Sequence, residues 1–291
     1  MIIDTRLRPP TPEFVRIMVE GPMTSTYFRK LKKIFPPRPI EEFLPEIDEA
    51  GITKAVLVGK SDQSTTRVSV PHEHIADLAR RYPGRFIGIA GIDPTVGTCG
   101  EVLQEVEMVV RELGMAGISL DLLATDVKYT DKRLYPIYAK CEELGAVVYI
   151  TTGYLMGRAS LDTGAPAAIN EIATDFPNLK IACPHACWPW VHEFMSVIMR
   201  SSVLGGGNVY CLLDVNRPWL PGSELYVQYA NQFPDIADHI LFGTGYPLSF
   251  WNPDGTPEAL PPRVERFRKL PFKPDVMEKV LYKNAVRLFG L

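Results

Sequence analysis

The 291-residue sequence lacks a strong net charge. Its 31 lysines and arginines and 34 aspartates and glutamates leave a formal net charge of −3. Proteins that bind nucleic acid or anionic membrane surfaces carry a clustered excess of basic residues. We therefore expect neither nucleic acid nor membrane as a partner, and any electrostatic argument about this chain must be local.

Long apolar runs and a disulfide framework are also missing. No run approaches the roughly 20 apolar residues that cross a bilayer. The first apolar run meets a charge at Asp4, too soon for the apolar core of a secretory signal. The five cysteines are an odd number in a chain too long for a disulfide-stapled scaffold. We expect reduced thiols and a cytoplasmic location.

What the sequence does contain is a regular alternation of short apolar runs with amphipathic segments. Runs of about five apolar, β-branched residues are typical of strands buried on both faces, as in parallel sheets covered by helices. The eight predicted strands are Met1–Thr5, Lys54–Gly59, Phe86–Gly91, Ala116–Leu120, Ala146–Thr151, Leu179–Cys183, Asn208–Leu213 and His239–Gly243.

The segments between these runs have helical periodicity. From Val102 to Leu113, for example, apolar residues recur every three or four positions and share one helical face. Glycines such as Gly51 and Gly114 stand where left-handed caps end a helix. The predicted helices are Ile40–Ala50, His72–Tyr82, Glu101–Leu113, Lys132–Leu144, Ala165–Phe176, Val191–Leu204, Glu224–Phe233 and Asp275–Phe289.

This alternation predicts a single α/β domain over residues 1–291, a closed (β/α)8 or TIM barrel. An open doubly wound sheet is the alternative, but its G-x-G-x-x-G fingerprint is missing after the first strand. Two proline-rich insertions, Arg6–Pro39 and Trp251–Pro262, follow the first and eighth strands. Because barrel active sites lie at the C-terminal ends of strands, these insertions are candidate lids, with surface decoration as the alternative.

Four stretches, in order from the first strand to the last helix, resemble one known family. They are IDTRLR at 3–8 (compare I-D-x-H-x-H), RYPGRF at 81–86 with Asp93-Pro94 (Y-P-x-R-F), LFGTGYP at 241–247 (L-F-G-T-D-Y-P) and NAVRLF at 284–289 (N-A-x-R-L-F). Together they resemble the amidohydrolase-related family of metal-dependent hydrolases, the branch that includes aminocarboxymuconate-semialdehyde decarboxylase-like enzymes.

The resemblance implies a divalent metal held by two histidines of strand one, single histidines of strands five and six, and an aspartate of strand eight. At these positions the chain has Arg6 and Arg8, Thr151, His185 and Gly245, so only His185 keeps its ligand type. A guanidinium donates no lone pair and repels a cation. We therefore predict no cofactor, and keep as alternatives a displaced zinc or manganese held by His185 and nearby aspartates, or a thiolate–imidazole metal site.

The two arginines suggest a different use of the barrel mouth. Arg6 and Arg8 are two apart on a strand, so both side chains point the same way, into the mouth. There they would capture a carboxylate or phosphate in a bidentate manner. The alternative is a set of buried ion pairs with Asp4, Asp121 or Asp214.

Other polar residues at strand ends complete the predicted site. Asp121 and Asp214 each follow an apolar strand, and either would orient His185 for proton transfer. The residues expected to give substrate neutral hydrogen bonds are Thr151, Thr244 and Tyr246. Further polar residues that follow strands are Lys60, Asp62, Asp93 and Asn216, of which Asp93 is expected to anchor a cap or loop.

The resemblance and the arginine pair together predict a hydrolase or decarboxylase-like carbon–carbon lyase. Its substrate would be a small anionic, carboxylated molecule, turned over without the usual divalent metal. The alternative is a catalytically inactive barrel that binds a ligand or serves as a scaffold. The aromatic residues Trp188, Trp190 and Phe194 suggest packing, which allows a homo-oligomer.

Overall fold

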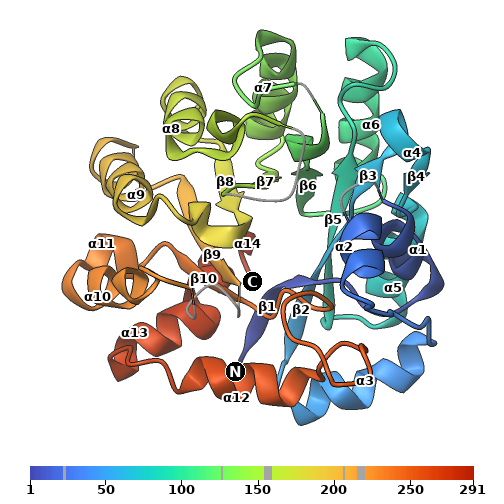
Figure 1. The fold of residues 1–291 in the computed structure, drawn as a ribbon. Helices are drawn as coiled ribbons and strands as arrows, with labels where there is room; N and C mark the ends of the chain where they lie inside the picture. Colours follow the sequence, from blue (N-terminus) through green and yellow to red (C-terminus); the bar gives the residue numbers. More distant parts are fainter. Residues whose placement is uncertain (22–23, 126, 154–158, 206, 215–219) are drawn as a thin grey trace.

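Eight parallel strands surround the centre of the molecule (Figure 1). The computed structural model describes all residues except 22–23, 126, 154–158, 206 and 215–219. In hydrogen-bonded order the strands are β1 (Ile3–Leu7), β2 (Lys54–Val58), β5 (Phe86–Ile92), β6 (Gly117–Leu120), β7 (Val147–Ile150), β8 (Lys180–Cys183), β9 (Val209–Asp214) and β10 (Ile240–Gly243). A short antiparallel pair, β3 (Ser61–Asp62) and β4 (Val68–Ser69), follows β2. All eight predicted strands are confirmed, with ends shifted by one or two residues.

The first and last strands meet across a seam that polar side chains hold together. Thr5 Oγ1 donates to the carbonyl of Phe242 at 2.7 Å, and Thr244 N donates to Asp4 Oδ1 at 3.0 Å. A backbone hydrogen bond from Arg8 N to Tyr246 O, 3.3 Å long, continues the contact. The arrangement is therefore a barrel, as predicted, and the open doubly wound sheet is wrong.

Helices cover the outside of the barrel (Figure 1). They are α1 (Pro12–Glu20), α2 (Thr24–Lys30), α3 (Ile40–Glu49), α4 (Gln63–Thr66), α5 (His72–Arg81), α6 (Cys99–Arg111), α7 (Tyr135–Glu143), α8 (Pro166–Asp175), α9 (Val191–Gly205), α10 (Glu224–Gln232), α11 (Pro234–Ala237), α12 (Leu260–Arg268), α13 (Pro274–Glu278) and α14 (Asn284–Phe289). Helix α6 begins two residues before its predicted start because Thr98 and Glu101 form a capping box there. No helix within the described ranges has the length and hydropathy of a membrane span.

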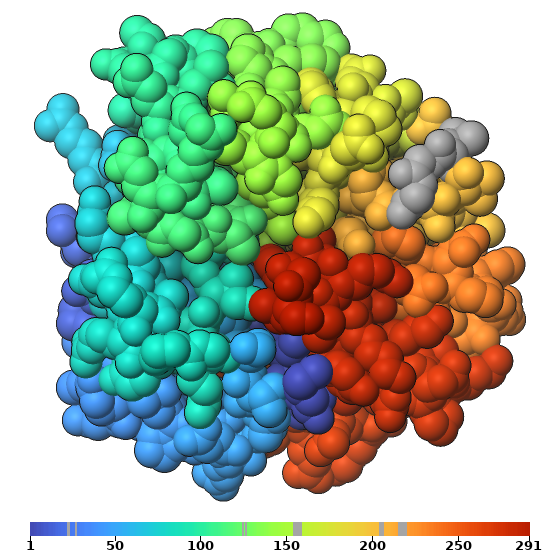
Figure 2. All heavy atoms as spheres, turned by 180° about the vertical axis from the view of Figure 1, so that it is seen from behind, coloured from blue at the N-terminus to red at the C-terminus, as the bar shows by residue number. Residues whose placement is uncertain are grey.

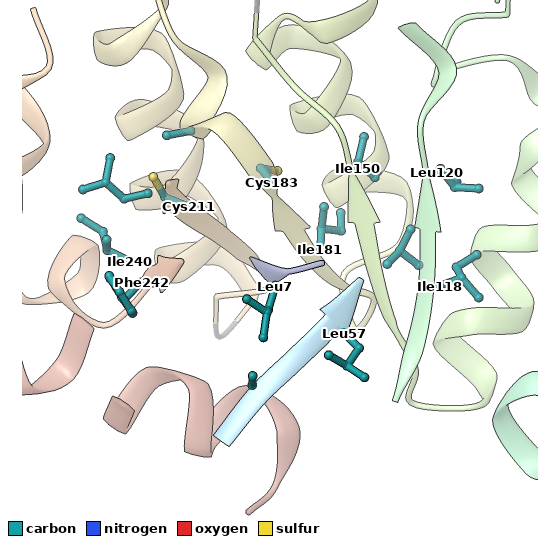
Figure 3. Close-up of a cluster of buried hydrophobic side chains, with 14 of the residues drawn as sticks. Leu7, Leu57, Ile118, Leu120, Ile150, Ile181, Cys183, Cys211, Ile240 and Phe242 are labelled. Carbon is teal, nitrogen blue, oxygen red and sulfur yellow. The ribbon is translucent and has the colours of Figure 1, made fainter. Parts of the chain in front are cut away.

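The side chains of the strands divide into an inner and an outer layer. Leu7 and Leu57 belong to the larger hydrophobic cluster, which includes apolar residues of the surrounding helices (Figure 3). Val56 and Val58, on either side of Leu57, belong instead to a smaller cluster inside the barrel. Because side chains alternate along a strand, the residues on either side of Leu7 point inward.

The last helix closes the barrel at the N-terminal ends of its strands. Ala285 and Leu288 of α14 belong to the same inner cluster as the strand residues Ile3 and Val147. In the view from behind, the C-terminal segment lies at the middle of this face, beside the N-terminus (Figure 2). Access to the barrel interior is therefore left to the opposite end, where the C-terminal ends of the strands lie.

The side chain of Asn284 connects helix α14 to the barrel by hydrogen bonds, and replacing Asn284 should destabilise the protein. Its side-chain amide, 1% exposed, donates to the carbonyls of Ala237 and Ile240 at 2.8 and 2.7 Å. We expect Asn284→Leu, which leaves both acceptors unsatisfied, to lower the free energy of unfolding by about 2–3 kcal/mol. Urea denaturation measures this. The exposed neighbour Lys283→Ala is the control, and equal effects of the two changes would contradict the assigned role.

The two proline-rich insertions pack on each other near the mouth. Ile34 N donates to Gly255 O at 3.0 Å, and the rings of Phe28 and Trp251 lie 5.4 Å apart. Gly255 is required at this contact because its φ is +88° and a Cβ would lie 2.6 Å from the carbonyl oxygen of Lys32. The first insertion contains α1, which reaches the barrel mouth.

Candidate active site

Arg6 and Arg8 lie inside the mouth of the barrel. They flank the outward-pointing Leu7, and both side chains are buried, with each residue 5% exposed. Gly243 on the neighbouring strand makes room for the first of them, because a Cβ there would lie 3.2 Å from Cβ of Arg6. The strand alternation thus directs both guanidinium groups inward, but their contacts differ.

Arg6, Asp214 and His185 form a closed triangle of polar contacts. Arg6 Nη1 donates to Asp214 Oδ2 at 2.8 Å, and His185 Nδ1 lies 2.6 Å from the same oxygen. The third side joins Arg6 Nη2 to His185 Nε2 at 3.2 Å. Asp214 ends β9 and is 1% exposed, so the triangle is shielded from water. Arg6 is thus engaged in the buried ion pair that was the alternative to anion capture.

The donors and acceptors of this triangle define one tautomer of His185. A guanidinium has donors only, so Nε2 must accept from Arg6 through its lone pair. The proton of a neutral ring then lies on Nδ1, 2.6 Å from Asp214 Oδ2. His185 is therefore neutral in this arrangement, and Asp214 orients its ring, as the sequence suggested for one of two aspartates.

The turn that carries His185 has an unusual backbone. His185, Ala186 and Cys187 have φ angles of +67°, +53° and +52°, a left-handed conformation that costs an L-residue about 1–2 kcal/mol. Thr152 holds this turn by donating to Pro184 O at 2.7 Å and accepting from Cys187 N at 3.1 Å. Strain of this kind clusters at functional sites. The contribution of Thr152 was missed, because sequence analysis selected its neighbour Thr151.

Arg8 has no carboxylate within ion-pair distance among the described residues. Its Nε donates to Val58 O at 3.0 Å, and Nη1 lies 3.9 Å from Met18 Sδ of α1. Burial, together with the neighbouring charge of Arg6, lowers the pKa of Arg8 to about 10, against the weaker attraction of Asp121 and Asp62. The mouth therefore contains a buried cation whose counter-charges are at a distance.

Lys60, Asp62 and Asp121 form a second ionic cluster in the same mouth. Lys60, 2% exposed, donates to Asp62 and lies 3.7 Å from Asp121 Oδ2. Burial and the charge of Asp121 raise the pKa of Asp62. Asp121, one of the two predicted supports for His185, pairs with Lys60 instead. Its Oδ1 is buried and has no hydrogen-bond partner among the described residues.

Asp4 and Thr244 have a structural role at the barrel seam. The Asp4 carboxylate accepts from the backbone of Arg6 at 2.9 Å and from the hydroxyl of Thr244 at 2.5 Å. Burial raises the pKa of Asp4, although these hydrogen bonds oppose the shift. Because the Thr244 hydroxyl donates to Asp4, the contacts favour a structural role for Thr244 over its predicted role as a hydrogen-bond donor to substrate.

The remaining predicted residues have different surroundings. Tyr246 contacts Phe35 and Phe43 and lines a cavity of about 280 Å³ between the two insertions, away from the triangle. Thr151 is buried in the mouth at 4% exposure. Asp93 is a loop anchor, as expected, and accepts from Ser64 and Thr95. Asn216 lies outside the described residues.

Tyr149 is a mouth residue that sequence analysis missed. It belongs to the inner cluster, is fully buried and donates to Thr5 O at 2.9 Å. Burial raises the pKa of its phenol, and Asp4 and Arg6 are among its charged neighbours. The available signal was its place on strand β7, two residues before Thr151 and therefore on the same face.

The residues present do not fit the divalent ion that the resemblance implies. The Nε2 lone pair of His185 and Oδ2 of Asp214, which would face a cation, both accept from Arg6. Within the described parts of the chain, no group of three or more histidine, cysteine, aspartate or glutamate residues is placed to hold a metal. Gly245 leaves the aspartate position empty, although a Cβ there would lie 3.6 Å from Cβ of Asp214, facing the triangle.

Comparison with known proteins places this barrel in a family. The amidohydrolase family model matches residues 24–291. The chain belongs to the amidohydrolase family. A curated relative, 2-amino-3-carboxymuconate-6-semialdehyde decarboxylase of Dictyostelium discoideum, is 28% identical over 131 residues. That match spans 39% of this chain and only 36% of the relative.

Two solved structures extend the likeness to the whole amidohydrolase barrel. An uncharacterised TIM-barrel protein from Bordetella bronchiseptica is 33% identical, with a TM-score of 0.80 over 99% of this chain and 98% of that one. The 5-carboxyvanillate decarboxylase of Sphingomonas paucimobilis is 17% identical, with a TM-score of 0.69 over 100% and 99% of the two chains. The second likeness is one of fold.

Proposed function

We propose that this protein is a decarboxylase-like enzyme that acts on a small carboxylated molecule without a divalent metal. The observation that carries the proposal is Arg8, a buried guanidinium at the barrel mouth with no carboxylate in ion-pair distance among the described residues. A buried charge is costly unless it is paired. The carboxylate of a substrate would complete the pair in bidentate geometry.

His185 is the residue that we assign to proton transfer. In a decarboxylation the bond between the carbon and its carboxyl group breaks, carbon dioxide leaves, and the electron pair on the carbon takes up a proton. In the resting arrangement Nε2 of His185 accepts from Arg6 and carries no proton. We assign proton delivery to a ring that first takes up a proton from solvent at Nε2, which breaks the contact with Arg6 while Nδ1 stays beside Asp214, and that then passes this proton to the carbon. The decarboxylases described above support a lyase reaction, and the name of the 5-carboxyvanillate enzyme supports a carboxylated aromatic acid as substrate.

A ligand-binding barrel without catalysis is the second candidate. It is favoured because charged groups of the mouth pair with one another. Arg6 contacts Asp214 and His185, and Lys60 contacts Asp62. Such networks also occur where charged groups only stabilise a fold. Turnover separates the two candidates, because both predict carboxylate binding at Arg8.

The deciding experiment is a screen of carboxylated aromatic and muconate-type acids for release of carbon dioxide, with chelator, with Zn²⁺ and with Mn²⁺. We expect turnover of at least one acid that the chelator does not reduce. His185→Gln should lower the rate by about 10²–10⁴-fold. The exposed His192→Gln on α9 is the matched control and should keep full activity.

Each other result has a clear meaning. Binding without turnover would establish the inactive barrel. Turnover that requires added metal would revive a displaced metal centre and end the metal-free proposal. Equal activity of wild type and His185→Gln would remove His185 from the mechanism.

A further inference from the structure

We infer that the Arg6 guanidinium is a built-in cation that takes the place of a divalent ion in this barrel. The inference goes beyond the proposed function and rests on it only where turnover is concerned. It starts from two buried lone pairs in the mouth, on His185 Nε2 and Asp214 Oδ2. Both accept from the same guanidinium, at 3.2 and 2.8 Å.

The surrounding residues complement this guanidinium. Gly243 and Gly245 carry no side chains where a Cβ would lie 3.2 Å from Arg6 Cβ and 3.9 Å from Arg6 Nη1, respectively. Gly245 stands where the resemblance expects an aspartate. The carboxylate that the resemblance assigns to the metal is therefore missing next to the Arg6 guanidinium, which we infer takes the metal's place. A guanidinium carries one positive charge and a divalent ion carries two, so the guanidinium needs fewer anionic partners. Asp214 is the carboxylate in contact with Arg6.

One of the three guanidinium nitrogens of Arg6 remains for a ligand. Its Nε is buried and has no hydrogen-bond partner among the described residues, whereas Nη1 and Nη2 are committed to Asp214 and His185. A buried donor of this kind is completed by an acceptor oxygen. The chemical class that fits is a carboxylate or enolate oxygen of the substrate, bound beside the ring of His185. Arg6 would thus hold the proton-transfer residue and also stabilise negative charge on the substrate.

Zinc binding tests this inference without any assay of activity. Wild-type protein, dialysed against Zn²⁺ and then against buffer, should retain no stoichiometric zinc by elemental analysis and give no heat of binding by calorimetry. Gly245→Asp alone should also bind none, because Arg6 remains to neutralise the new carboxylate. The double variant Arg6→His with Gly245→Asp should bind about one equivalent. The left-handed φ of +62° at Gly245 is one that aspartate tolerates better than most residues.

A second measurement uses only the wild-type protein, in case the double variant does not fold. In a ¹⁵N-labelled sample the ring of His185 should be protonated on Nδ1 and bare on Nε2, and added Zn²⁺ should leave its signals unchanged. Stoichiometric zinc in wild type, or movement of the His185 ring signals with zinc, would overturn the inference. A folded double variant that takes up no zinc would overturn it as well.

These outcomes are separable from failure of the proposed function. Suppose that no acid is turned over, that wild type binds no zinc and that the double variant binds zinc. The built-in cation is then supported and the proposed enzymatic function is wrong. If acids are turned over only by a zinc-loaded wild type, the built-in cation is wrong while the decarboxylase activity stands.

Discussion

Replacing Arg8 with Met is expected to raise the stability of the protein and to abolish its affinity for carboxylates. In the unliganded protein, burial and Arg6 lower the pKa of Arg8 to about 10 from 12.5. At 1.36 kcal/mol for each pKa unit, the buried charge costs on the order of 3 kcal/mol. Methionine has a similar length, suits the contact with Met18, and removes this cost. We expect the midpoint of thermal unfolding to rise by about 5 °C.

The same change should remove the bidentate anion site that we propose at Arg8. Carboxylate ligands that raise the melting temperature of wild type should have no effect on Arg8→Met at the same concentrations, because binding to the native state is what stabilises it. Arg16→Met, at an exposed position on α1, is the control and should change stability by less than about 0.5 kcal/mol. A destabilised Arg8→Met protein that still binds carboxylates would show that Arg8 has only a structural role.

Asp214→Asn is expected to be among the most destabilising single changes in the mouth. The carboxylate is 1% exposed and contacts both Arg6 and His185, so its neutralisation leaves the Arg6 charge buried without a counter-ion in contact. Breaking one partner of a buried ion pair costs about 3–5 kcal/mol. The neutral amide also favours the Nδ1 proton of His185 less than a carboxylate does, so activity should fall with stability.

A double-mutant cycle isolates this interaction. Combining Asp214→Asn with Arg6→Met removes the orphaned charge, so the double variant should recover much of the lost stability, with a coupling energy of about 2 kcal/mol or more. The exposed pair Glu265 and Lys269, each 69% exposed, is the control and should couple by less than about 0.5 kcal/mol. Urea denaturation measures all four corners, and additive effects at Arg6 and Asp214 would contradict the buried pair.

The barrel could be predicted from the sequence because its signals are local. Each strand is a short apolar run and each helix a periodic one, and eight repeats of that alternation leave few topologies. The differences lie at element ends, where a single contact decides: the Thr98–Glu101 capping box starts α6 early. The π-helical turn at Lys279–Lys283, which divides the predicted last helix into α13 and α14, has no such local signal.

For the candidate site, the sequence predicted only those features that follow from the alternation of side chains along a strand. The two-residue spacing of Arg6 and Arg8 determined that both point inward, and the position of His185 after a strand placed it in the mouth. The sequence left Asp121 and Asp214 as equal candidates to support His185. Their real partners depend on the relative positions of strands across the barrel, between residues as far apart as Arg6 and Asp214, 208 positions away.

Only the tertiary structure decided which charges meet. It brings Asp214 to Arg6 and His185, and Asp121 to Lys60, and it leaves Arg8 without a carboxylate in contact within the described residues. The physical reason is that barrel closure sets the spacing of side chains from different strands, which no local pattern encodes. The sequence by itself determined the barrel, with Arg6, Arg8, Thr151 and Gly245 where the resemblance expects metal ligands. The fold determined that Arg6 lies in a buried ion pair and that Arg8, among the described residues, has no carboxylate within ion-pair distance.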